Sequence, residues 1–375
     1  MYFESTHREI QARARKFAQE ELTDQVLDQA EDTGVFSNEV IQKMADQGFF
    51  GIKTPKALGG MGADHRAYVL VMEEIAKVSA VASLYVSSPN SLSGGPLLLS
   101  GTKEQQEKYL RPCATGEKML CFGLTEPNAG SDAGSITTHA VRTEGGYILN
   151  GRKTFITMAP LSDFGIIYAK TDRTKRTKGI SAFIVDMKAS GVSFGKPENK
   201  MGLIGCATSD IILDHVFVPE EDRLGEENMG FVNAMKTLDV GRMGVAAQAI
   251  GVAAGSLEDA IALIKEKKNS PQGTAFALAR MASGLEAARQ LVYRAAWIKD
   301  TCNDPKASTM AASMAKLFAT ETCCRICSEA VSLCPLEGTA RGTKLERRFR
   351  DCRVFTIYEG TSQVQEMVIS GQLLA

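Results

Sequence analysis

The chain has 375 residues, of which 44% are hydrophobic, and a formal net charge of −1. This length is enough for two or three domains that share large hydrophobic cores. The balanced charge argues against nucleic acid or an anionic membrane as a partner, so any affinity for phosphate groups must come from local sites.

The first part of the chain has the spacing of amphipathic helices. Between Thr6 and Leu110, apolar residues recur every three or four positions, as at Ile10, Ala14 and Phe17. We therefore predict an N-terminal helical domain over residues 1–119. The first residues lack a basic segment followed by an apolar run, and we find no apolar run of 18 residues. We expect a soluble, cytoplasmic protein.

The middle of the chain has the pattern of short strands. Apolar and β-branched runs such as 164–169 and 180–185 are separated by Gly145-Gly146 and Asn150-Gly151, which are typical of hairpin turns. We predict a small β-barrel or sandwich domain over residues 120–228.

From Gly230 onward, Ala-rich stretches again have the spacing of helices, most clearly over 243–265 and 275–299. We predict a C-terminal helical domain over residues 229–375. The fold class is therefore α+β, with the β domain between two helical parts.

The nine cysteines do not suggest a secreted disulfide framework, because their number is odd and their spacing is scattered. Cys324 and Cys327 form a CxxC, and Cys323 lies on the same helical face as Cys327. Since no second CxxC or pair of histidines completes a tetrahedral site, we interpret these cysteines as packing residues and expect no metal.

The segment Ile357–Gln363, with the sequence IYEGTSQ, carries the first candidate for catalysis. Glu359 precedes a glycine that allows a sharp turn, and Ser362 with Gln365 fits a capping box for a closing helix. This arrangement can present a carboxylate as a base. The alternative is a glutamate that only favours a helix N-terminus.

Two further segments support the catalytic interpretation: Phe122–Asp132, with the sequence FGLTEPNAGSD, and Phe155-Ile156-Thr157. Together with IYEGTSQ they resemble the acyl-CoA dehydrogenase family, and the butyryl-CoA type most closely. The resemblance follows the chain in order through 17–22, 72–77, 238–249 and 350–351. It implies that the C-terminal helices form a four-helix bundle.

The resemblance implies an FAD enzyme that desaturates an acyl-CoA thioester, or reduces an enoyl-CoA by the same steps reversed. Glu359 would be the base at the α-carbon, and flavin N5 would accept the hydride from the β-carbon. Other members carry the base at the position of Gly241, where a glycine cannot serve. The expected partner for electrons is an electron-transferring flavoprotein. Acyl length and direction stay open.

Residue by residue, the resemblance implies two sets of contacts. Strand alternation places Phe155 and Thr157 on one face, as contact with one flavin ring requires. For Asp239 and Arg242, the alternative is an ion pair on a helix surface. The expected FAD contacts are Phe122, Leu124, Thr125, Ser131, Phe155, Ile156, Thr157, Thr361, Ser362 and Gln363, and the expected substrate contacts are Ser131, Asp239, Arg242 and Gly360.

The sequence departs from the family where one subunit normally contacts the FAD of its neighbour. The departures are at Glu266–Gly273, at Ser332–Leu336 and at Glu366, where an arginine is usual. They imply weakly bound FAD in a homo-oligomer, a dimer or tetramer, or a heteromer with a paralogous subunit that supplies the missing contacts. A third interpretation is a degenerate, FAD-poor relative that binds acyl-CoA as a scaffold or a non-redox lyase.

Overall fold

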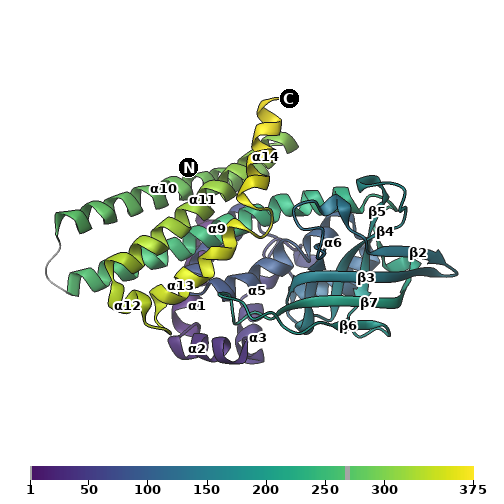
Figure 1. Cartoon of the computed structure of the whole chain (residues 1–375), viewed down its shortest axis with the longest axis horizontal. Helices are drawn as coiled ribbons and strands as arrows, with labels where there is room; N and C mark the ends of the chain where they lie inside the picture. The colour runs from purple at the N-terminus through teal and green to yellow at the C-terminus, as the bar shows by residue number, and fades with distance from the viewer. Residues whose placement is uncertain (1, 267–270) are drawn as a thin grey trace.

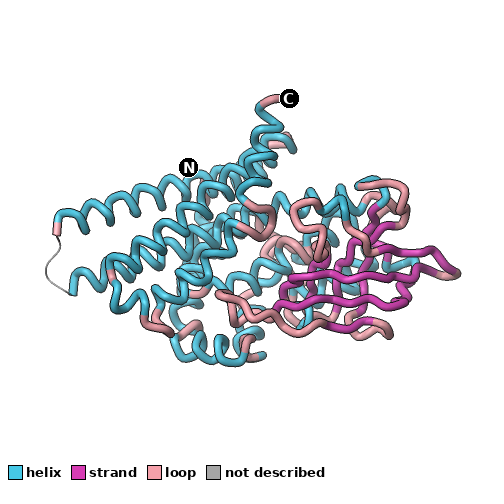
Figure 2. The backbone as a smooth tube through the Cα atoms, in the orientation of Figure 1, coloured by secondary structure: helices cyan, strands magenta, loops and turns pink. Residues whose placement is uncertain are grey.

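A computed structural model of the chain describes residues 2–266 and 271–375. Figures 1 and 2 show the strands gathered at one end of the molecule and the long helices at the other, with the first three helices of the chain below the long ones. The predicted α+β arrangement, with a β domain between two helical parts of the chain, is confirmed.

Several of the N-terminal helices begin after an N-cap residue whose side chain accepts a hydrogen bond from a free backbone N–H of the first turn. Thr23, Ser37 and Asp64 each accept a hydrogen bond from a backbone N–H of the helix that follows. The helices are α1 (Ser5–Glu21), α2 (Asp24–Thr33), α3 (Asn38–Asp46), α4 (His65–Val78), α5 (Ala80–Asn90), α6 (Gly95–Ser100), α7 (Lys103–Gln105) and α8 (Arg111–Ala114).

The middle of the described chain forms one eight-stranded sheet in the order β6-β7-β3-β2-β4-β5-β8, with β1 paired in parallel to β4. The sheet folds back on itself, since Phe183 of β5 and Val216 of β7 share one core. The strands are β1 (Leu120–Gly123), β2 (His139–Thr143), β3 (Gly146–Thr157), β4 (Phe164–Lys170), β5 (Ile180–Asp186), β6 (Val192–Phe194), β7 (Thr208–Pro219) and β8 (Arg223–Leu224).

The predicted turn at Asn150-Gly151 is wrong, because both residues lie inside β3. The hairpin turn that precedes β3 is at Glu144-Gly145, where Gly145 has a φ of 74°. Gly151 is needed for a different reason: a Cβ there would lie 2.3 Å from Thr138 Oγ1. A glycine inside a strand commonly marks such a close approach.

The C-terminal part is built on three long helices, α9 (Gly230–Glu266), α10 (Gln272–Thr301) and α11 (Pro305–Leu333). Lys267–Ser270, within the first predicted departure from the family, lie outside the described residues. The shorter helices α12 (Pro335–Thr339), α13 (Lys344–Cys352) and α14 (Ser362–Leu373) follow, and α13 and α14 both pack on α11.

Helix α9 joins the parts of the molecule, because it packs on α4, α11 and β5. One continuous core contains residues of both the N-terminal and the C-terminal helices. Among the described helices, α9 alone is long and apolar enough to cross a membrane, by length and composition only. Its most apolar stretch has a mean hydropathy of 1.3 and is 72% buried inside the protein, as in a core helix.

Candidate functional site

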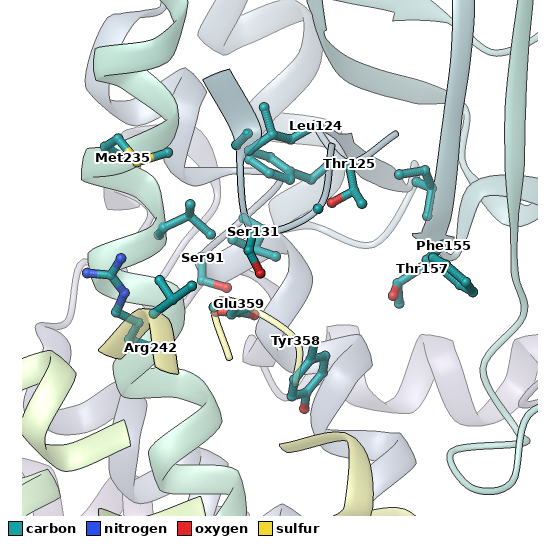
Figure 3. A pocket seen from close by; sticks show the side chains of 18 of the residues that line it. Ser91, Leu124, Thr125, Ser131, Phe155, Thr157, Met235, Arg242, Tyr358 and Glu359 are labelled. Carbon is teal, nitrogen blue, oxygen red and sulfur yellow. The ribbon is translucent and has the colours of Figure 1, made fainter. Parts of the chain in front are cut away.

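A cavity of about 380 Å³ lies where α5, α9, the β domain and the segment before α14 meet. Figure 3 shows Arg242 and Met235 on α9 at one side, Phe155 and Thr157 on β3 at the other, and Glu359 between them. Segments that are more than 200 residues apart in the sequence therefore form one site.

Glu359 is presented by an unusual piece of backbone. Its φ is 54°, a left-handed value that non-glycine residues rarely adopt, and Gly360 follows with a φ of 96°. The side chain reaches toward α9, where a Cβ at Gly241 would lie only 2.0 Å from Glu359 Oε2. The carboxylate therefore occupies the space that a side chain at position 241 would need.

The surroundings of Glu359 raise its pKa toward neutral pH. Burial raises the pKa of Glu359 to about 7, although the positive charges of Lys316 and Arg242 act in the opposite direction. Oε2 is buried without a hydrogen-bond partner among the described residues. A carboxyl group with this pKa can both accept and donate a proton near pH 7.

The carbonyl groups around Glu359 are held from two sides. Gln365 Nε2 donates hydrogen bonds to Gly360 O at 3.0 Å and to Glu359 O at 3.4 Å, and Lys316 Nζ donates to Gly360 O at 2.6 Å. The predicted capping box of Ser362 with Gln365 is wrong. Thr361 is the N-cap of α14, and its hydroxyl accepts a hydrogen bond from Val364 N.

The opposite wall comes from a bulge in β3. The pairing of β3 with β7 shifts register between Lys153 and Ile156, and Phe155 has a φ of 55°. Lys153 and Thr154 are both buried, whereas Phe155 is 64% exposed at the cavity. The bulge therefore changes which side chains face the cavity, a common feature of strands next to functional sites.

The loop after β1 is fixed by a buried ion pair. Lys153 Nζ lies 2.7 Å from Glu126 Oε1 and also donates to Leu124 O at 3.1 Å. The same carboxylate accepts hydrogen bonds from Thr137 N, Thr137 Oγ1 and Thr138 N. These contacts hold the segment that brings Leu124 and Thr125 to the cavity.

The cavity wall suits the FAD expected from the resemblance. The hydroxyls of Thr125 and Thr157 line the cavity and have no hydrogen-bond partner within residues 2–266 and 271–375. The ring of Phe155 lies exposed beside Thr157. An aromatic ring with free hydroxyl groups next to it fits a flat ligand that has polar atoms at its edge.

The structure brings most of the predicted site residues to the cavity. The predicted residues that line it are Phe122, Leu124, Thr125, Ser131, Phe155, Ile156, Thr157, Arg242, Glu359 and Gly360. Four predicted residues do not line it: Asp239, Thr361, Ser362 and Gln363. Thr361 instead caps α14, and Asp239 lines a neighbouring cavity on the other side of α9.

Asp239 and Arg242 do form an ion pair, with Asp239 Oδ1 at 2.8 Å from the Arg242 guanidinium. The pair is not a surface pair, since Arg242 is 6% exposed, and burial lowers the pKa of its guanidinium. Arg242 Nε is buried without a partner among the described residues. Arg242 therefore keeps one unused hydrogen-bond donor, Nε, beside the cavity that it lines.

Several cavity residues have no strong signal in the sequence. Ser87 and Ser88 line it from α5, Ser91 lines it from the end of that helix, and Met235 and Leu238 line it from α9. The three serines lie within residues 81–95, where the sequence led us to expect the base of the acyl pocket. Lys316 and Lys153, which hold the two sides of the site, were missed. A lysine inside an apolar helix or strand was the only signal that could have found them.

Two of the predicted departures lie outside this cavity. Pro335 and Leu336 begin α12, and the Leu336 side chain is 77% exposed. Glu366 lies on the exposed side of α14. Within the described chain, Cys323 and Cys327 are buried on α11, and no group of three or more His, Cys, Asp or Glu residues could hold a metal ion.

Comparison with known proteins identifies the family. Profiles of the acyl-CoA dehydrogenase N-terminal, middle and C-terminal domains match residues 4–117, 121–216 and 228–374. A subunit of a caffeyl-CoA reductase–Etf complex from Acetobacterium woodii is 60% identical over 380 residues, covering 100% of both chains. A 3-(aryl)acrylate reductase from Clostridium sporogenes is 54% identical over 381 residues, also covering 100% of both.

A solved structure shows the same fold over the whole length. The butyryl-CoA dehydrogenase of Megasphaera elsdenii is 37% identical, with a TM-score of 0.94, and the match covers 100% of this chain and 99% of that one. The chain therefore belongs to the acyl-CoA dehydrogenase family, the flavin-dependent oxidoreductases that act on CH–CH bonds of acyl-CoA thioesters.

Proposed function

We propose that this protein reduces the α,β double bond of an aryl-acryloyl-CoA thioester, with Glu359 as the group that exchanges the α-proton. The observation that carries the proposal is the unpaired Oε2 of Glu359, which lies between Gly241 and the β3 wall. Phe155 and Thr157 would hold FAD at that wall, and the flavin would supply the hydride for the β-carbon. The free hydroxyl groups on that wall support this role over the flavin-free alternative.

The protein's own groups would act on the face of the substrate opposite the flavin. The backbone N–H of Glu359 donates to no other described group, so it is free to bind the thioester carbonyl. A hydrogen bond there would stabilise negative charge as it develops on that oxygen. With a pKa of about 7, Glu359 can hold the proton that it gives to the α-carbon during reduction.

Two relatives support the direction and the substrate class. The proteins that are 60% and 54% identical are named as a caffeyl-CoA reductase subunit and an arylacrylate reductase, and the first is part of an Etf complex. The cavity wall on α5 agrees with an aryl group, because Ser87, Ser88 and Ser91 are small side chains between Leu84 and Leu92. We propose an electron-transferring flavoprotein as the partner.

The test uses the purified holoprotein under anaerobic conditions. The flavin is reduced and mixed with cinnamoyl-CoA or crotonyl-CoA, and its reoxidation is followed by absorbance. We expect faster reoxidation with cinnamoyl-CoA, and loss of it in Glu359→Gln. Equal or faster reoxidation with crotonyl-CoA would contradict the aryl assignment. No reoxidation with either thioester would contradict the reductase assignment.

A further inference from the structure

Lys316 lies behind the reacting carboxylate, on α11, and is fully buried with an exposure of 0%. Its Nζ donates a hydrogen bond of 2.6 Å to Gly360 O, the carbonyl of the residue that follows Glu359. No ion pair joins it to a carboxylate anywhere in the described chain. Lys153, equally buried, has the Glu126 carboxylate at 2.7 Å.

A buried ammonium group is costly unless an opposite charge compensates it. Burial lowers the pKa of Lys316 to about 8, and the charge of Glu359 is the largest effect that opposes this. In return, the positive charge of Lys316 is the largest effect that opposes the rise in the pKa of Glu359. The two groups are therefore coupled through charge, while the direct contact of Lys316 is with the neighbouring carbonyl.

We propose that Lys316 is a positioning residue for the α-proton exchange. Its Nζ fixes the Gly360 carbonyl, and with it the left-handed turn that aims Glu359, while its positive charge favours the ionised form of Glu359. This inference rests on the proposed role of Glu359. It adds a group that lies outside the cavity wall and touches neither thioester nor flavin.

Other charged and titratable groups face this pair from the elements packed around it. Arg242 contributes a second positive charge from α9, partly balanced by Asp239. Tyr68 on α4 and Tyr358 have pKa values raised first by burial and then by Glu359, so both stay neutral. Glu321 and Cys324 on α11 act on Lys316 itself. The experiment must therefore separate Lys316 from these groups.

The two directions of the reaction should respond differently to loss of the ammonium group. Without it, Glu359 keeps its proton to a higher pH. Desaturation needs the carboxylate, so its rate near pH 7 falls. Reduction needs the protonated acid, so the pH at which its rate declines moves upward. A purely structural role for Lys316 would not shift both pH profiles upward, with a lower rate of desaturation and a higher rate of reduction at the same pH.

The test is an infrared titration of the holoprotein. The carboxylic C=O band of Glu359 is assigned by difference from Glu359→Gln and followed with pH. In Lys316→Met we expect the midpoint to rise by about one pH unit or more, the usual effect of removing a nearby opposite charge. Thr320→Val is the matched control, since Thr320 is also buried on α11 and bonds only within its own helix.

Lys316→Gln separates charge from hydrogen bonding, because its amide can still donate to Gly360 O. We expect its midpoint to rise as in Lys316→Met, with a smaller loss of kcat. If Lys316→Met does not fold, Lys316→Gln decides the question by the same titration. An unchanged midpoint in a folded Lys316 variant would overturn the proposal. A Glu359→Gln enzyme that stays active would instead overturn the role of Glu359 and leave the coupling intact.

Discussion

Lys153 Nζ lies 2.7 Å from Glu126 Oε1, and both side chains are almost completely buried. The pair ties β3, which carries Phe155 and Thr157, to the loop that carries Thr125. Burial alone would raise the pKa of Glu126, but the charge and hydrogen bond of Lys153 outweigh it and lower the pKa to about 2. The two segments that carry Thr125 and Thr157, the free hydroxyl groups of the proposed flavin site, therefore both depend on this ion pair.

Lys153→Met should destabilise the protein and loosen the loop around Thr125. It leaves the buried Glu126 carboxylate without a counter-charge, which typically costs about 3–5 kcal/mol in the free energy of unfolding. Chemical denaturation measures the loss. Adding Glu126→Gln should recover part of this loss. A double variant whose loss in the free energy of unfolding equals the sum of the losses in the two single variants would show that the pair is not coupled.

Glu359→Gln should keep the fold and the flavin but slow the reaction by about 10²–10⁴-fold, the usual effect of losing a general acid–base group. Stopped-flow flavin absorbance measures the rate. The double variant Glu359→Gly with Gly241→Glu should recover part of the activity. Its new carboxylate starts from a Cβ that points at the vacated position of Oε2. Near wild-type rates in Glu359→Gln would exclude this residue as the proton-exchange group.

The pH dependence of stability should also reveal the raised pKa of Glu359. Its pKa in the folded protein is about 7, against an ordinary value of 4.5, so the folded protein binds this proton more tightly than the unfolded chain. Stability from this group is therefore lost as pH rises from 4.5 to about 7. Relative to wild type, Glu359→Gln should gain roughly 3 kcal/mol across that window. A difference that does not change with pH would contradict the raised pKa.

Thr157→Val should shift the flavin absorption spectrum and slow hydride transfer, because it removes a hydroxyl that has no protein partner at the cavity wall. The two side chains have nearly the same volume, so folding should change little. The measurement is the visible spectrum of the purified holoprotein. Thr154→Val, a buried change three residues away on β3, is the control. Identical spectra for Thr157→Val and wild type would place the flavin elsewhere.

FAD should dissociate more readily from this protein than from relatives with glycines at positions 335 and 336. Each lost charge-assisted contact is worth about 1.5–3 kcal/mol. Leu336 is exposed and lies outside the cavity of its own chain, so the effect requires a second subunit. Pro335→Gly with Leu336→Gly should tighten FAD only in the oligomer. Stoichiometric, tightly held FAD in the unchanged protein would contradict this prediction.

Patterns along the chain were enough to predict the order of the domains, because helical and strand spacing change clearly near Leu120 and Gly230. The same patterns misplaced a turn at Asn150-Gly151, since a glycine that allows close packing inside a strand has the same local sequence as a hairpin. Alternation placed Phe155 and Thr157 on one face, and both line the cavity, although a bulge with a positive φ at Phe155 interrupts the alternation.

Positions set by tertiary contacts could not be predicted from the sequence. Lys316 lies 43 residues before Glu359, and nothing in a helical pattern reveals which carbonyl a buried lysine will meet. Asp239 matched the expected motif, yet the rotation of α9 turns it toward another cavity. Such details depend on how long helices are oriented around each other.

The close approach of Gly241 and Glu359 determines where the reacting carboxylate can rest. A Cβ at position 241 would lie 2.0 Å from Glu359 Oε2, and the atom that it meets is the end of a flexible side chain. A side chain at position 241 could therefore be accommodated only if the Glu359 carboxylate moved from its present position. The absence of a side chain at Gly241 thus takes part in positioning the carboxylate, although the glycine has no polar group that could act in the reaction.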